Sequence, residues 1–122
     1  MRTVIFDSSF LIAVAEHPTQ WKEDIIDSIG GFEPVMLKCV EEELSRISSG
    51  GGKRAKFARV ALQLAGGFRS APSGRADVDD EISSAALGTN AIVATSDREL
   101  AKSLRALHVQ VVGLRSGRAT IE

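Results

Sequence analysis

Four acidic residues stand where their carboxylates could come together to do chemistry. Asp7 and Asp97 each follow a short apolar run, Asp79 follows a loop, and Glu43 lies in a segment with helical periodicity. Four carboxylates at close quarters repel one another, which raises their pKa values and destabilises the fold. A hard cation relieves that repulsion, and an all-oxygen ligand set suits Mg²⁺ or Mn²⁺. The residue types and their positions therefore predict a metal site.

Each acid also has a structural interpretation. Aspartate is a favoured helix N-cap, so Asp7, Asp79 and Asp97 could cap the helices that follow them. Glu43 could be an exposed helix residue. Asp80 is either an additional acid of the site or a cap or surface residue. Because such positions rarely coincide by chance, the joint arrangement favours the metal site.

Alternating apolar runs and helical periods are typical of an α/β fold with a parallel sheet. The pattern predicts four to five strands and about five helices. Strands are expected over residues 3–6, 35–38, 91–95 and 109–114, and segment 68–76 is a loop or weak strand. Ligands bind at the carboxyl edge of such a sheet, so Asp7 and Asp97 are expected at that edge.

The charge is unevenly distributed along the chain. The net charge is −1, yet residues 45–76 contain seven bases and no acid. This basic block is either a solvated surface or a patch that attracts a polyanion. Within it, Phe57, Val60, Ala61 and Leu64 have the spacing of a buried helix face. The glycine-rich stretch before Lys53 lacks the spacing of a nucleotide-binding loop.

Length and composition narrow the possibilities further. A chain of 122 residues with 43% hydrophobic residues fits one globular domain over residues 1–122. The single cysteine, Cys39, rules out an internal disulfide, and it is expected to be buried, like Trp21. His17 and His108 are too few for a histidine-based metal site, and each is expected to be a surface or packing residue. No apolar run reaches membrane-spanning length, so a cytoplasmic protein without membrane contact is expected.

Four passages of the chain resemble the PIN-domain family, small metal-dependent ribonucleases that include VapC-type toxins and ribosomal-RNA processing nucleases. The passages are V-I-F-D-S-S at 4–9, C-V-E-E-E-L at 39–44, D-D-E-I at 79–82 and A-T-S-D-R-E-L at 94–100. The four passages occur in the same order as in the family, and the resemblance covers about residues 3–114. Ser8 and Ser96 stand where threonine and asparagine are common.

The resemblance implies a three-layer α/β/α fold with a mainly parallel sheet of four to five strands. It also implies that Asp7, Glu43, Asp79 and Asp97 hold one or two Mg²⁺ or Mn²⁺ ions. Such ions activate a water for in-line attack on an RNA phosphodiester and neutralise charge at the leaving oxygen. The implied activity is a metal-dependent endoribonuclease.

Other residues take supporting roles in this interpretation. Ser8 and Ser96 would orient the carboxylates through hydrogen bonds. Arg54, Lys56 and Arg59 would contact RNA phosphates, which gives affinity without sequence preference. The biological role is left open between a VapC-type toxin, which has an antitoxin partner and can form a homodimer, and an RNA-processing nuclease.

Two other classes of function remain as alternatives. The first is a PIN-fold RNA-binding or scaffold module with a weak metal site. The second is a phosphoacceptor or phosphatase module, which also has an aspartate at a strand end. The chain lacks the lysine after the last strand that a phosphoacceptor module needs. A haloacid-dehalogenase-like phosphatase has a second aspartate two residues after the first, and in this chain Ser9 stands at that position.

Overall fold

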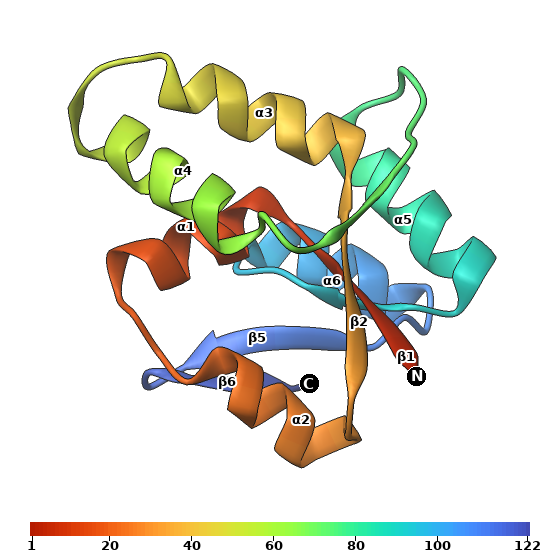
Figure 1. Cartoon of the computed structure of the whole chain (residues 1–122). Helices are drawn as coiled ribbons and strands as arrows, with labels where there is room; N and C mark the ends of the chain where they lie inside the picture. Colours follow the sequence, from red (N-terminus) through yellow and green to blue (C-terminus); the bar gives the residue numbers. More distant parts are fainter.

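The computed structural model describes all 122 residues and contains one six-stranded sheet flanked by helices (Figure 1). The strand order is β3-β2-β1-β4-β5-β6, with β6 antiparallel to β5 and every other neighbouring pair parallel. The strands are β1 (Arg2–Phe6), β2 (Phe32–Leu37), β3 (Arg69–Ala71), β4 (Ile92–Ala94), β5 (Val111–Arg115) and β6 (Arg118–Ile121). The helices are α1 (Ser8–Glu16), α2 (Trp21–Ile29), α3 (Lys38–Ser48), α4 (Gly52–Leu64), α5 (Val78–Thr89) and α6 (Arg98–Ala106).

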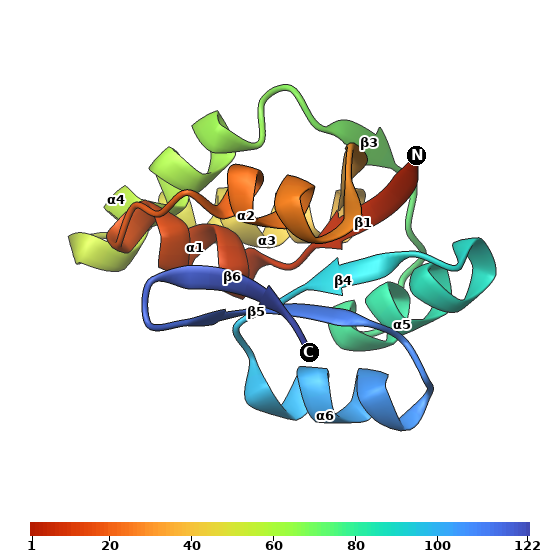
Figure 2. The ribbon, with the colours of Figure 1, turned by 90° about the horizontal axis from the view of Figure 1, so that it is seen from below.

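The helices form two layers, one on each face of the sheet. Figure 2 shows α1 to α4 on one side and α5 and α6 on the other, which confirms the expected three-layer α/β/α architecture. None of the helices combines the length and the apolar character that a membrane crossing requires.

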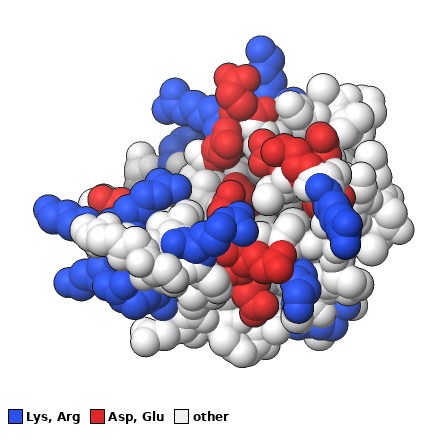
Figure 3. Space-filling view, turned by 90° about the horizontal axis from the view of Figure 1, so that it is seen from above, with Lys and Arg blue, Asp and Glu red and all other residues white.

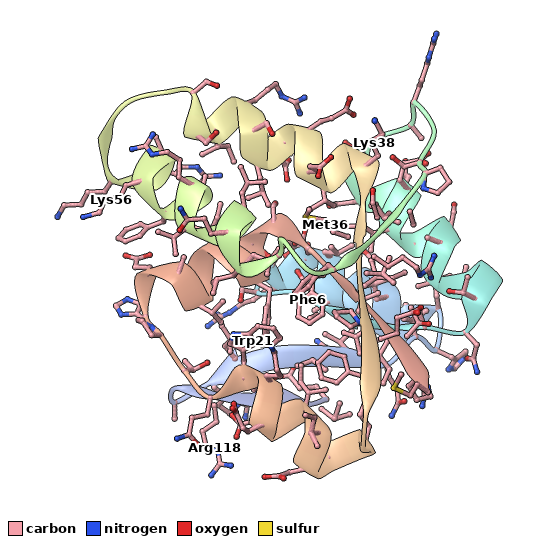
Figure 4. All side chains as sticks on the ribbon, viewed as in Figure 1. Phe6, Trp21, Met36, Lys38, Lys56 and Arg118 are labelled. Atoms are coloured by element: carbon pink, nitrogen blue, oxygen red, sulfur yellow. The ribbon has the colours of Figure 1, made fainter.

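The two strands that precede the candidate aspartates lie side by side at the centre of the sheet. Val4 pairs with Ile92 and Phe6 with Ala94, and all four are fully buried. A strand covered on both faces reads as a continuous apolar run, which is why the sequence marks β1 and β4 clearly. Phe6 also anchors an aromatic cluster, with its ring 5.3 Å from that of Trp21 (Figure 4). This packing fixes the point at which β1 ends and Asp7 begins.

The sheet has six strands instead of the four to five expected. β3 lies within segment 68–76, which was expected to be a loop or weak strand; it has only three residues, two of them exposed, at the sheet edge. The strand that was not expected is β6. β6 returns antiparallel through a tight turn in which Ser116 and Gly117 have φ angles of 53° and 78°. Two positive φ values in succession are the requirement of a hairpin turn, so Ser116-Gly117 was the missed sequence feature.

One buried contact fastens the C-terminal hairpin to the rest of the molecule. Asp24 of α2 is 6% exposed and accepts hydrogen bonds from Arg118 Nη2 and from the backbone N–H of Ala119, both at 3.0 Å. Arg118, labelled in Figure 4, reaches across from β6 to α2. The Asp24 carboxylate thus gives the buried backbone N–H of Ala119 an acceptor, and its two hydrogen bonds hold α2 against β6 at the edge of the sheet.

The buried face of α4 differs from the expected one. Ala55, Ala58 and Ala61 are buried, whereas Leu64 is 40% exposed. The prediction of a Phe57–Leu64 face was therefore wrong except at Ala61. Helix α4 packs against both α1 and α3. Small alanine side chains allow the helices to approach closely. The size of the side chains, more than the spacing of the large hydrophobic residues, therefore determines which face of α4 is buried.

Candidate active site

Asp7 lies at the carboxyl end of β1 and is held by two hydroxyl groups. Its Oδ2 accepts hydrogen bonds from Ser9 Oγ at 2.6 Å and from Thr95 Oγ1 at 2.8 Å. Its backbone N–H donates to the carbonyl of Ala94 at 2.9 Å, which continues the β1–β4 ladder by one residue. Asp7 is the N-cap residue of α1, yet its side chain makes no capping hydrogen bond. The carboxylate is thus held in place for a role other than capping.

Glu43 approaches the same region from α3. This helix begins directly after β2, so its second turn lies over the carboxyl edge of the sheet. The Ser8 hydroxyl donates a hydrogen bond to Glu43 Oε1. Ser8 thus orients a carboxylate, as the sequence predicted.

Asp79 and Asp97 enter at the starts of two helices on the opposite face of the sheet. Asp97 caps α6, because its Oδ1 accepts from the backbone N–H groups of Glu99 at 2.9 Å and Leu100 at 3.2 Å. Asp79 lies inside the first turn of α5, whose N-cap residue is Asp77. The capping interpretation therefore describes Asp97 and fails for Asp79.

The four acids meet in one cavity of about 380 Å³. The cavity is lined by Asp7, Ser8, Ser9, Ile12, Ala13, Glu16, Glu43, Arg54, Asp79 and Asp97. Figure 3 looks onto the α3–α4 side of the molecule, where acidic side chains gather in the middle and basic side chains lie on both sides. The expected convergence of Asp7, Glu43, Asp79 and Asp97 is present in the structure. Asp80 is exposed and does not line the cavity.

The electrostatics of the cavity disfavour charge on two of the acids. Burial raises the pKa of Asp7, partly offset by the hydrogen bonds from Ser9 and Thr95, while the nearby Glu43 carboxylate raises it further. The pKa of Asp79 is also raised, first by burial and then by the negative charges of its acidic neighbours. Those neighbours are Asp7, Asp97, Asp77 and Glu43. Acids that raise the pKa of one another form a site that a cation would stabilise.

The donor set fits a hard divalent cation in chemistry but is not yet arranged around one. All polar groups that line the cavity carry oxygen, except the guanidinium of Arg54, and oxygen is the ligand that Mg²⁺ and Mn²⁺ prefer. No three acidic, histidine or cysteine side chains are already grouped as ligands of one ion. Asp7, Glu43, Asp79 and Asp97 are the residues that could hold it.

Two hydroxyl groups of the site were missed in the sequence. Ser9 and Thr95 hold Asp7, and their hydroxyl oxygens lie 3.1 Å apart. Ser96, expected to orient a carboxylate through its hydroxyl, instead donates its backbone N–H to Ser9 Oγ at 3.0 Å. Thr95 is the last buried residue before the turn, and Ser96 is already exposed, so the inward-pointing hydroxyl belongs to Thr95.

The three expected phosphate contacts are separated by the structure. Arg54 lines the acidic cavity. Lys56 points outward from α4, away from the body of the molecule (Figure 4). Arg59 Nη1 donates to the carbonyl of Ser48 at 2.8 Å and so braces the loop between α3 and α4. Of the three, only Arg54 is placed to meet a phosphate at the acids.

The residues expected to have structural roles behave as predicted. Cys39 and Trp21 are buried. His17 and His108 are exposed. None of them lines the acidic cavity.

Fold and site together define an α/β/α protein with an acidic cavity at the carboxyl edge of a mainly parallel sheet. The family model described as "PIN like domain" matches residues 4–117. The chain therefore belongs to the PIN-like domain family, as the four sequence passages indicated.

Solved structures show the same fold at low sequence identity. The PIN domain endonuclease Utp24 is 22% identical, with a TM-score of 0.82 over 98% of this chain and 90% of that one. A domain of a functionally unknown protein from Methanocaldococcus jannaschii is 17% identical, with a TM-score of 0.69 over 100% and 97%. The protein PAE2754 from Pyrobaculum aerophilum is 18% identical, with a TM-score of 0.55 over 87% and 86%. The comparison with curated proteins found no match.

Proposed function

We propose that this protein is a metal-dependent endoribonuclease that uses Mg²⁺ or Mn²⁺. The observation that carries the proposal is the convergence of Asp7, Glu43, Asp79 and Asp97 in one cavity. Membership of the PIN-like domain family supports it, and so does the likeness in fold to a protein described as a PIN domain endonuclease.

The hydroxyl groups of the site keep two carboxylates ready for this chemistry. Ser9 and Thr95 both donate to Asp7 Oδ2 and so fix the orientation of this carboxylate. Ser8 orients Glu43 in the same way. Such second contacts fix ligand geometry and are commonly worth 10- to 100-fold in metal affinity or activity.

The remaining residues deal with the charge of the substrate. When bound, Mg²⁺ or Mn²⁺ would supply an activated water and neutralise charge at the phosphate. Arg54 extends into the cavity from α4 and would contact the phosphate beside the acids. The Asp97 cap fixes one acid to the start of α6, so its position does not depend on the substrate.

A catalytically weak RNA-binding or scaffold module is the second candidate. One observation favours it: no three acids are already grouped as ligands of a single ion. The raised pKa of Asp79 argues for the nuclease, because a scaffold gains nothing from acids that destabilise one another. Both foreseen biological roles, a toxin held by an antitoxin or an RNA-processing nuclease in the cytoplasm, would use the same chemistry.

The test is cleavage of mixed single-stranded RNA by the wild-type chain with Mg²⁺ or Mn²⁺. Parallel samples contain EDTA, or the Asp7→Asn variant with metal. The nuclease proposal expects cleavage only by the wild type with metal. Binding of RNA without cleavage under either metal would favour the scaffold module. Cleavage that survives EDTA in the wild type but is absent from Asp7→Asn would be a metal-independent activity of this protein and would refute the proposal, whereas equal cleavage by both preparations would come from a contaminant.

A further inference from the structure

A larger groove adjoins the acidic cavity on the α6 side. It has a volume of about 750 Å³ and lies between α6 and β5. Asp97 lines both the groove and the acidic cavity, so the two adjoin at that residue. Only Ala101 and Leu114 among its twelve lining residues are hydrophobic. A lining this polar does not suit an apolar small molecule, whose pockets are mostly hydrophobic.

The groove carries four basic side chains from two walls and three acidic ones, Asp97, Glu99 and Glu122, so the basic side chains outnumber the acidic ones by one. Arg98, Lys102 and Arg105 follow one another at helical spacings of four and three, which places them along one face of α6. Arg115 contributes from β5. None of these residues belongs to the basic block at residues 45–76.

Ion pairing divides the groove into a neutralised end and a free end. The Glu122 carboxylate pairs with Arg105 at 3.1 Å and with Arg115 at 3.7 Å. Arg98 and Lys102 have no ion pair. Arg98 directly follows Asp97 in the chain, so the unpaired bases lie at the end of the groove beside the acidic cavity; Glu99 also lines this end but forms no ion pair with them.

We propose that this groove binds the sugar–phosphate backbone of the RNA strand whose scissile bond lies in the acidic cavity. The inference rests on the proposed function and adds to it a path for the substrate. Four carboxylates repel phosphates, so the flanking phosphates must be held outside the cavity. Arg98 and Lys102 are bases without an ion pair that line the groove next to it.

The size of the groove matches a short run of nucleotides. From Arg98 to Arg105 the helix rises about 10 Å at 1.5 Å per residue. Successive phosphates of a stacked strand lie about 3.4 Å apart along the axis, so about three of them fit beside α6. Contacts of exposed basic side chains with phosphates position a strand without reading its sequence. The groove therefore supplies affinity and orientation, and base selectivity lies elsewhere.

The experiment measures binding of a single-stranded RNA of about 12 nucleotides, a length within the usual site sizes of single-strand-binding proteins. EDTA is present throughout, because the groove needs no metal and cleavage must be prevented. The variants are Lys102→Gln and the double variant Arg98→Gln/Lys102→Gln. Lys22→Gln is the matched control, since Lys22 is exposed on α2 and lies outside both cavities. Melting temperatures check that each variant is folded.

The expected effect follows from counterion release. For single strands the affinity varies as the salt concentration to the power of about −0.7 per phosphate contact. Between about 1 M and about 0.1 M salt, one phosphate contact therefore raises the affinity about fivefold, and a variant that lacks the contact loses that gain at 0.1 M salt. Lys102→Gln should therefore lose about fivefold, and the double variant about 25-fold with a salt slope shallower by about 1.4. Lys22→Gln should leave both quantities unchanged.

Each other outcome has a defined meaning. Unchanged RNA affinity in the double variant, with a wild type that cleaves RNA, overturns the groove assignment and leaves the proposed function standing. Weakened binding, with a wild type that cleaves under neither metal, supports the groove and refutes the nuclease. If the double variant keeps its RNA affinity but no longer binds poly-glutamate, the groove takes an acidic polypeptide instead. A wild type that binds no RNA overturns both proposals.

Discussion

Replacing Asp7 by asparagine separates the chemical role of this residue from its structural role. The side chain is 5% exposed, and burial raises its pKa, so at neutral pH the ionised carboxylate destabilises the metal-free fold. Each unit by which the pKa is raised corresponds to about 1.4 kcal/mol. The amide oxygen of asparagine can still accept the hydrogen bonds of Ser9 and Thr95. Asp7→Asn should therefore be at least as stable as the wild type without metal.

The opposite effect is expected on activity. A bound metal contributes several kcal/mol to such a reaction, and each 1.36 kcal/mol is tenfold in rate. Loss of one charged ligand should lower cleavage by about a hundredfold or more. The same variant should lose the rise in melting temperature that Mg²⁺ or Mn²⁺ gives the wild type, because stabilisation by a ligand follows its affinity for the folded state.

The pH dependence gives an independent check of the sign. The raised pKa means that the folded state takes up the proton of Asp7 at a higher pH than the unfolded chain does. The destabilisation is complete above the folded pKa and disappears as the pH falls toward the ordinary aspartate value. The stability gain of Asp7→Asn over the wild type, measured without metal, should therefore be largest near neutral pH and shrink in acid.

Thermal unfolding with EDTA and cleavage with metal, measured side by side, test this reasoning. The matched control is Asp80→Asn, which removes one charge from an exposed acid outside the cavity and should change neither quantity. A gain of 1 kcal/mol should appear as about 4 °C in a chain of this size. A melting temperature that falls sharply in Asp7→Asn would show that the residue is a structural anchor. Undiminished cleavage would remove Asp7 from the site.

Three further predictions concern other contacts of the site and of the fold. Asp97→Asn should keep the melting temperature, because asparagine caps helices well, but lose cleavage, whereas Asp97→Ala should lose cleavage and about 1 kcal/mol in a denaturant titration. Arg54→Gln should lower the cleavage rate more than Lys56→Gln, because only Arg54 lines the acidic cavity; equal effects would contradict this placement. Asp24→Ala should reduce the free energy of unfolding by about 1–3 kcal/mol, because the backbone N–H of Ala119 loses its acceptor, while cleavage below the melting temperature stays unchanged.

The central strands could be predicted from the sequence because their buried positions are occupied by apolar residues. The buried residues of β1 and β4, residues 4–6 and 92–94, are all apolar and covered on both faces, so the ends of these strands, and hence Asp7 and the Thr95–Asp97 turn, were located correctly. Edge strands lack this property. β3 is short and polar, and β6 depends on a hairpin turn and on the contact between Asp24 and Arg118, which joins residues 94 positions apart. Pairing of that kind is set by the tertiary structure.

The candidate site, too, could be predicted only in part. Acids at strand ends and helix starts could be placed, because the carboxyl ends of parallel strands share one edge of the sheet. The direction in which each polar side chain points could not. Thr95 points toward Asp7 while Ser96 is exposed, and Arg54 lines the acidic cavity while Lys56 points away. These differences of one or two residues depend on the phase of a strand end or a helix, which a single sequence does not fix.

The distribution of charge links the proposed chemistry to the proposed path of the substrate. An acidic cavity attracts a cation and repels a polyanion, so the two ligands of a nuclease make opposite demands on the same surface. In this molecule the basic groups lie beside the acids, Arg54 on the α4 side and Arg98 and Lys102 on the α6 side. Interactions between exposed charges are screened within about 10 Å, so basic residues far from the cavity would not compensate the repulsion.

Because of this arrangement, substitutions on the α6 side and on the α4 side of the cavity should affect different kinetic constants. A residue that holds flanking phosphates binds the ground state and the transition state alike, so its loss raises KM and leaves kcat. Arg54 would meet the phosphate at which charge develops, so its loss should lower kcat itself. The ratio of the two effects in Lys102→Gln and Arg54→Gln thus tests whether α6 guides the strand while α4 takes part at the scissile bond. Equal shifts of KM and kcat in both variants would place the two residues in one undivided binding surface.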